Sequence, residues 1–257
     1  NAPATSPTGA GGMAARALDS LDEGLTVGHE GDPGTIQRQL HGTGWRGANV
    51  GDAAFEGSGS ILDEPILVVN QKAKLIELSN QFSVFNQHGQ RIGAVNETGQ
   101  STLKKAVRLL TSYDQYLTHR YEVLDANGAA VLRLTRPAKL VKSSIIVSNG
   151  ADQAIGTIRQ DNVFGKIHFS LEAANGVVGS IRAENWRAWN FRIEDHSGRE
   201  VARITKTFEG FLKNSFTTAD NYVVQIHERL ADPLRSLVVA AAVSIDTALK
   251  QDQRGLN

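Results

Sequence analysis

The feature that most constrains the fold is an uncharged run near the C-terminal end of the chain. Residues 236–245 carry no charged side chain, and residues 237–243 are apolar throughout. Pro233 suits the first turn of a helix, where its missing N–H costs nothing, and Asp232 before it is an N-cap candidate. A helix that is apolar on every side must be buried in protein or in lipid. The sequence therefore predicts a buried helix over residues 233–250.

The length of this run favours burial in protein. A membrane-spanning helix needs about 20 mostly apolar residues. Here the uncharged run has only ten residues, and Arg235 and Asp246 close it. An acidic residue near a bilayer centre is costly. We therefore expect a core helix, with a transmembrane helix as the alternative, and its candidate core residues are Leu237, Val238, Ala241 and Ile245.

The chain from residue 61 onward repeats one pattern. A few alternating apolar residues lead into a polar turn with glycine, and an apolar run returns. The turns fall at residues 86–89, 125–128, 173–176 and 195–198. Asn-Gly and Ser-Gly supply the positive φ angles that tight hairpins demand. Many hairpins and one apolar helix predict a mainly β fold, an antiparallel barrel that closes on itself and encloses the helix.

The first 60 residues differ in composition from the rest of the chain. They hold 13 of the 25 glycines and three of the six prolines, without a sustained apolar period. Such a segment buries too little surface to offset its ordering entropy, so we expect a flexible, disordered tail over 1–60 and a barrel domain over 61–251. The Gly-x-Gly-x-x-Gly pattern at 42–47 lacks the flanking strand and helix of a dinucleotide site, and we interpret it as coincidence.

Composition narrows the function classes. The 257 residues carry no net charge, which gives nucleic-acid binding little support, and no cysteine, which excludes disulfides, thiolate metal sites and palmitoyl anchors. The seven histidines lack metal-ligand spacing, and no nucleophile elbow is present. We expect no enzymatic activity.

Two motifs resemble a known family. Residues 216–222 read Phe-Thr-Thr-Ala-Asp-Asn-Tyr ahead of the apolar helix, and residues 155–160 read Ile-Gly-Thr-Ile-Arg-Gln. Both are similar to motifs of the phospholipid scramblases. The resemblance covers about residues 66–250 and extends to the plant LURP-one proteins and, more distantly, to the tubby C-terminal domain.

The resemblance implies a tubby-like barrel of about twelve strands around the C-terminal helix. It also implies a membrane-associated protein that binds phospholipids and moves them between leaflets, lying in the cytoplasm against the inner face of the plasma membrane. The alternative is a soluble tubby-like or LURP-one-like binding or scaffold module without transport activity.

Basic residues are the candidates for contact with anionic phospholipid headgroups, the expected partner of this chain. The alternative is an ordinary solvated surface. The candidates form two clusters: Arg133, Arg136, Lys139 and Lys142, and Lys104, Lys105 and Arg108. Separately, Trp186 and Trp189 lie beside Arg182, Arg187 and Arg192, and one of the two tryptophans is a candidate interfacial anchor.

Calcium is the one cofactor that the resemblance suggests. The calcium loop proposed for animal relatives falls on residues 218–229 here. Its first and last positions are Thr218 and Arg229, where a hard cation prefers carboxylates. Only Asp220 and Asn221 remain as oxygen ligands, so we expect no calcium dependence and no cofactor.

Overall fold

The structure, a computed structural model, describes residues 33–43, 47–71, 81–98, 118–138, 142–162, 166–184, 190–207 and 221–254. Twelve strands and two helices lie in this part of the chain. The helices are α2 (Pro33–His41) and α4 (Leu234–Arg254). The strands are β1 (Ile66–Gln71), β2 (Gln81–Phe85), β3 (Arg91–Thr98), β4 (His119–Asp125), β5 (Ala130–Arg136), β6 (Ser144–Asn149), β7 (Ala154–Gln160), β8 (His168–Ala173), β9 (Gly176–Ala183), β10 (Asn190–Asp195), β11 (Glu200–Thr207) and β12 (Asn221–Ile226).

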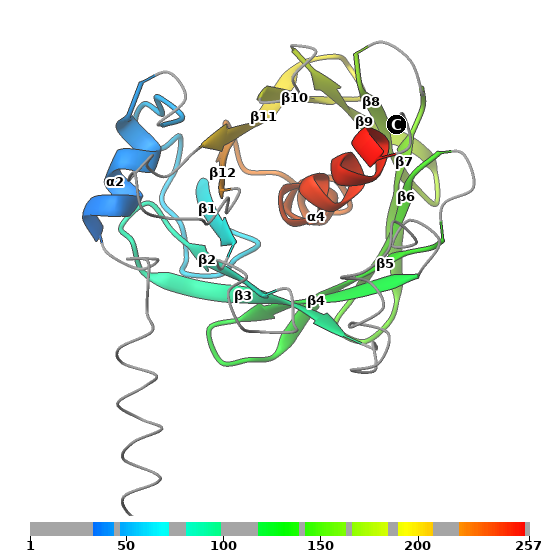
Figure 1. The fold of residues 1–257 in the computed structure, drawn as a ribbon, viewed down its shortest axis with the longest axis horizontal. Coiled ribbons are helices and arrows are strands. Elements are labelled where there is room, and N and C mark those ends of the chain that lie inside the picture. The colour runs from blue at the N-terminus through cyan, green and yellow to red at the C-terminus, as the bar shows by residue number, and fades with distance from the viewer. Residues whose placement is uncertain are drawn as a thin grey trace, which may run out of the picture. The chain divides into compact units, whose positions relative to one another are not determined.

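The strands form a closed antiparallel barrel. Each pairs with the next along the chain, and β12 returns to pair with β1, so that no sheet edge is left open. Figure 1 shows α4 inside the ring of strands. The predicted mainly β fold, a closed twelve-stranded barrel around a C-terminal helix, is confirmed.

Side chains from alternate strand positions meet α4 in the barrel interior. On β5, Leu132 and Leu134 point inward, and both are buried together with the helix residues Leu237, Val238 and Ala241. The three helix residues were predicted core positions, and the structure confirms them. Ile245 lies in α4, but its side chain is outside the described set. Within the described residues, neither helix is long and apolar enough to cross a membrane.

Two glycines bring the barrel wall close to α4. A Cβ on Gly156 of β7 would lie 3.3 Å from Leu237 Cδ1 and only 2.2 Å from the backbone oxygen of Glu172. A Cβ on Gly179 of β9 would lie 3.1 Å from Leu234 Cδ1. Gly156 is the glycine of the 155–160 motif, so close packing against helix and neighbouring strand gives that motif a physical role.

Asp232 fixes the start of α4. Its Oδ1 accepts hydrogen bonds from the backbone N–H and the hydroxyl of Ser236, at 3.2 and 2.6 Å. Burial alone would raise the pKa of Asp232, but the hydrogen bonds from Ser236 and Arg235 outweigh it and the pKa is lowered. The predicted N-cap candidate thus stays ionised at the positive end of the helix dipole.

Four hairpins share one turn geometry. In each, a side-chain oxygen accepts hydrogen bonds from the N–H groups two and four residues later, and the residue three positions later has a positive φ. The accepting residues are Asn86, Asp125, Asn149 and Asp195. The positive-φ residues are Gly89, Gly128, Asp152 and Gly198. This is a type I turn followed by a left-handed residue, and it explains the recurring polar turns in the sequence.

Asp195 offers a pH-dependent test of these turns. The hydrogen bond from Ser197 is the largest of the effects that lower its pKa to about 2. The pKa of an aspartate in an unfolded chain is about 3.9. The ionised side chain therefore stabilises the folded state above that pH, and this stabilisation is lost as the pH falls through the folded-state pKa of about 2. In Asp195→Asn the turn should survive, because asparagine fills the same position at Asn86 and Asn149.

We therefore expect the melting temperature of Asp195→Asn to lie below that of the wild type at neutral pH. The gap should close as both proteins are titrated from pH 4 towards pH 2. Melting curves across this range measure it, and a gap that stays constant would show that the Asp195 charge plays no part.

The outer face of β1 carries a second, smaller core. Ile66 and Val68 of β1 point away from the barrel interior and pack against Ile36 and Leu40 of α2, all four of them buried. Figure 1 shows α2 outside the barrel beside β1. The described part of the first 60 residues thus includes a helix packed on the barrel, and the expectation of a flexible tail is wrong for that part. Residues 1–32 and 44–46 lie outside the described set.

The chain folds back on the end of α2. The N–H groups of Ala48 and Val50 donate to the carbonyls of Gln39 and Leu40, both at 2.8 Å. A Cβ on Gly47 would lie 2.4 Å from the Cα of Gly42, so only glycine fits there. Two glycines of the Gly-x-Gly-x-x-Gly pattern therefore allow a tight backbone crossing.

Candidate functional site

The two ends of the barrel differ in the length of their connections. The short hairpins after β2, β4, β6, β8 and β10 lie at one end, here called the hairpin end. The six longer connections join strands at the other end, here called the loop end. The chain crosses the hairpin end through Ile61, which is buried in the main core. Arg229 secures this crossing, because it donates to the backbone oxygen of Glu56 at 2.7 Å and lies over the ring of Phe55 at 4.8 Å.

Polar side chains line the barrel interior near the loop end. Glu97 and His119 are buried there, with His119 Nδ1 2.5 Å from Glu97 Oε1. The ring of His119 stacks on Tyr121 at 6.3 Å between centroids. Arg136 lies opposite His119 in the strand register. It is two residues beyond the inward-facing Leu134, so it shares the inner face of β5.

Arg136 corrects one expectation of the sequence. Only 2% of its surface is exposed, so it does not belong to an outer headgroup-binding surface. Arg133 does lie on the outer face, but its guanidinium donates to Glu122, Gly150 and Asp152 at 2.7–3.1 Å. Hydrogen bonding to Glu122, then to Asp152, raises the pKa of Arg133 and keeps it charged. Lys142 is exposed at the loop end, so the structure does not bring these three residues into one cluster.

The remaining predicted headgroup residues lie outside the described set: Lys104, Lys105, Arg108 and Lys139. The connection that carries the first three joins β3 to β4 at the loop end. Asp220 also lies outside the described residues, whereas Asn221 begins β12 and is 2% exposed. Among the described residues, no group of three or more His, Asp or Glu side chains is placed to hold a metal ion.

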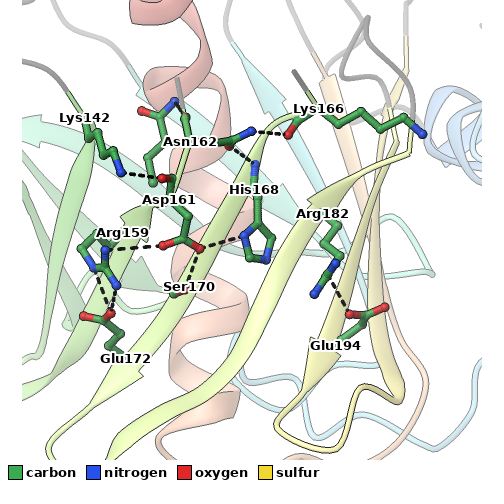
Figure 2. A network of polar contacts seen from close by, with 11 residues as sticks. Lys142, Arg159, Asp161, Asn162, Lys166, His168, Ser170, Glu172, Arg182 and Glu194 are labelled. Carbon is green, nitrogen blue, oxygen red and sulfur yellow. Dashed lines mark hydrogen bonds and ion pairs between the residues drawn. The ribbon is translucent and has the colours of Figure 1, made fainter. Parts of the chain in front are cut away.

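Asp161 is the centre of a polar network just beyond β7 (Figure 2). Its Oδ2 accepts a hydrogen bond from Ser170 Oγ at 2.7 Å and lies 2.8 Å from His168 Nδ1. Its backbone oxygen accepts a hydrogen bond from Lys142 Nζ. Ser170 and His168 both reach Asp161 in these contacts, which is not the relay in which a histidine takes the proton of a serine. The network links the end of β7 to the start of β8.

Arg159 connects this network to the neighbouring strand. Its Nη1 lies 3.5 Å from Asp161 Oδ1, while Nε and Nη2 both contact Glu172 Oε1. The hydrogen bonds to Glu172 raise the pKa of Arg159. This guanidinium uses all three of its nitrogens on protein carboxylates.

Three arginines lie side by side on the outer face of β9, β10 and β11. Arg192 is directly opposite Arg182 on one side and Arg203 on the other. Like charges opposite one another destabilise a sheet. Glu194 offsets the first pair, because its two oxygens lie 3.0 Å from Arg182 Nε and 2.8 Å from Arg192 Nε. Figure 2 shows the Arg182 contact on the same side of the barrel as the Asp161 network.

Arg203 is neutralised separately. Its Nη1 donates to Glu184 at 2.7 Å, and its Nε and Nη2 donate to Glu200 at 2.9 and 3.0 Å. The hydrogen bond from Arg203 lowers the pKa of Glu184 against the opposing effect of burial, and the charges of Arg203, Arg192 and Lys166 lower it further. Arg192 and Lys166 therefore lie within electrostatic reach of Glu184.

The sequence indicated this face only in part. Arg182 and Arg192 stood out as neighbours of two tryptophans, and Arg159, Asp161 and Glu194 were not singled out. The sequence could have indicated that Arg182 and Arg192 lie near each other, because both occupy outward positions on consecutive strands. Which residue stands opposite which depends on the register, and spacing alone does not give it.

Comparison with known proteins supports the resemblance. The model of the family described as Scramblase matches residues 58–249, which include every strand of the barrel and most of α4. The chain belongs to the Scramblase family. The predicted membership of the phospholipid scramblase family is confirmed. The matched range includes the residues of the Asp161 network and the three neighbouring arginines Arg182, Arg192 and Arg203.

Relatives of this chain occur in two yeasts. A phospholipid scramblase family protein of Schizosaccharomyces pombe is 25% identical over 182 residues, which cover 64% of this chain and 47% of the relative. The chain thus spans about half of that protein. Altered inheritance rate of mitochondria protein 25 of Saccharomyces cerevisiae is 22% identical over 236 residues, covering 73% of this chain and 71% of the relative. A solved structure of an Arabidopsis thaliana protein has 11% identity and a TM-score of 0.41, covering 74% of this chain and 99% of that one.

Proposed function

We propose that this protein binds phospholipid membranes from one side and promotes the movement of phospholipids between leaflets. The observation that carries the proposal is the family match over the whole barrel. Apolar residues of α4 fill the barrel core, so we place the lipid contact on the outside of the barrel and not along its axis. Lipid exchange in vesicles that contain fluorescent phospholipid tests the transport step.

The loop end is the side that we expect to meet the membrane. The exposed Lys142 and Lys166 lie there, and the connection with Lys104, Lys105 and Arg108 joins strands at the same end. The hairpin end is crossed by the segment that Arg229 secures. Each basic residue near an anionic surface adds about 1 kcal/mol of attraction.

We expect the protein to float with anionic vesicles at low salt and to be released at high salt. Screening causes the release, because the Debye length falls from about 10 Å at 0.1 M salt to about 3 Å at 1 M. Lys142→Gln with Lys166→Gln should weaken binding to anionic vesicles by up to about thirtyfold and leave the melting temperature nearly unchanged, since exposed charges contribute little to stability. Arg91→Gln with Arg199→Gln removes two charges from the hairpin end and serves as the control.

The two pairs of substitutions separate the outcomes. Equal loss of flotation in both would show that total charge matters and not the loop end. Flotation that persists at high salt would indicate apolar insertion instead. Absence of flotation on every vesicle would favour the alternative, a soluble tubby-like or LURP-one-like binding module. One observation favours that alternative: Arg133, Arg159 and Arg203 form ion pairs with carboxylates of the protein itself.

Two finer proposals go with this function. Calcium is not required, since Thr218 and Arg229 stand at the two end positions of the loop, and flotation should be the same with calcium as with a chelator.

The membrane is the cytoplasmic face of the plasma membrane, and microscopy of the tagged chain tests it. A mitochondrial location would instead agree with the name of the budding-yeast relative.

A further inference from the structure

We propose that Arg182 and Arg192, oriented by Glu194, form a two-guanidinium fork that binds the phosphate of a phosphomonoester headgroup at the membrane surface. The inference rests on the proposed membrane binding and names the headgroup chemistry that the outer face would recognise. The inference depends on which guanidinium nitrogens of Arg182 and Arg192 contact Glu194, and not on the total charge of the surface.

Glu194 contacts both guanidiniums. The two arginines are register partners on adjacent strands, where opposed side chains have Cβ atoms about 4.5–5.5 Å apart. Each lies close to Glu194 through Nε, at 3.0 Å for Arg182 and 2.8 Å for Arg192, and the Arg192 contact is an ion pair without hydrogen-bond geometry. Glu194 itself is 12% exposed and lies beneath them, whereas the side chains of Arg182 and Arg192 are 53% and 42% exposed.

The terminal nitrogens distinguish this pair from three other ion-paired arginines of the barrel. Arg159, Arg199 and Arg203 all direct Nη nitrogens at protein carboxylates. The contacts found for Arg182 and Arg192 within the described residues involve Nε alone. Four Nη groups on two neighbouring strands therefore remain to donate hydrogen bonds to a ligand.

The charge and shape of this fork fit a phosphate group. Guanidinium nitrogens pair with phosphate oxygens in parallel hydrogen bonds, which a lysine ammonium does not reproduce. One carboxylate offsets two guanidiniums, so the fork itself keeps a positive charge. Lys166 adds a third cation near the same face, because its charge acts on Glu184 as that of Arg192 does.

A phosphomonoester suits the four donors better than a phosphodiester. Its three free oxygens can each accept a hydrogen bond, and its charge approaches −2 near neutral pH. A diester offers two free oxygens and one charge. Packing does not account for the arginine pair, because opposed like charges destabilise a sheet and exposed ion pairs return little stability.

Substitution by lysine tests the fork while it preserves charge. The full chain with Arg182→Lys and Arg192→Lys is compared with the wild type on phosphatidylcholine vesicles that contain either phosphatidic acid or phosphatidylserine, matched in surface charge. The wild type should prefer phosphatidic acid. The double lysine variant should lose about tenfold in affinity for phosphatidic acid vesicles and keep its phosphatidylserine binding. The control is Arg159→Lys with Arg199→Lys, which should keep the preference, and melting curves verify that all variants fold.

A titration with inorganic phosphate, followed by NMR of the arginine Nε–H signals, separates the sources of the phosphate. Shifts at Arg182 and Arg192, together with displacement of the protein from phosphatidic acid vesicles, support the headgroup site. Shifts without any vesicle binding would show a soluble phosphate ligand, and would contradict both the membrane source and the proposed function. A wild type that floats but shows no preference for phosphatidic acid, or a lysine variant that keeps the preference, would overturn the fork and leave the proposed function standing.

Discussion

Replacing Ala241 with aspartate is expected to unfold the barrel. Ala241 is 1% exposed and lies in the middle of the core that α4 shares with the strands. A carboxylate placed there would have neither water nor a cation to compensate its charge. An uncompensated buried charge costs about 3–5 kcal/mol. The free energy of unfolding of a typical domain is about 5–15 kcal/mol, so this cost is a large part of it. We expect loss of the cooperative thermal transition measured by circular dichroism.

Ala231→Asp is the matched control for this change. Ala231 is exposed just before α4, so the same substitution leaves the new carboxylate in water. Its melting temperature should stay close to that of the wild type. An Ala241→Asp protein that melts like the control would mean that α4 is not enclosed by the barrel in solution, and a membrane role of the helix would then have to be reconsidered.

The hairpins and the core helix were predictable because their signals are local. A turn such as Asp-Ala-Asn-Gly at 125–128 contains both the side chain that accepts the turn hydrogen bonds and the glycine with positive φ. The uncharged run at 236–245 likewise indicates burial without reference to any other segment. Closure of the barrel followed, because a helix of this kind needs apolar cover on all sides.

The orientation of Arg136 could have been predicted from strand parity. Leu132, Leu134 and Arg136 share one face of β5, and the first two are clearly core residues. Grouping basic residues by their distance along the chain placed Arg136 with Arg133, although successive strand residues point to opposite faces. The pairing of Arg182 with Arg192 is harder to predict, because it depends on the register of two strands joined by a connection of several residues.

The packing of α2 was missed because its composition resembles a linker. Glycine and proline are frequent around it, and only Ile36 and Leu40 mark an apolar helix face. The stronger signal lies in β1, where four consecutive apolar residues at 66–69 require cover on both faces of the strand. α4 covers only the inner face, so another segment has to cover the outer one.

Leu40→Ala is expected to destabilise the protein through this outer core. Leu40 is 1% exposed and packs with Val68 and Phe85 against the outside of the barrel. Truncating a buried leucine removes apolar contact and leaves a cavity, with a typical cost of about 2–5 kcal/mol. We expect a value near the lower limit, since the site lies between a short helix and one face of the sheet. Chemical denaturation followed by tryptophan fluorescence measures the free energy of unfolding.

Val177→Ala provides the comparison for Leu40→Ala. Val177 is 54% exposed on β9, so its truncation removes apolar atoms without opening a cavity and should change the free energy of unfolding by less than about 0.5 kcal/mol. If Leu40→Ala were equally neutral, residues 33–41 would behave in solution as the flexible tail that composition suggests. A clear difference between the two variants would establish that the barrel needs the segment before residue 58, where the family match begins, to cover the outer face of β1.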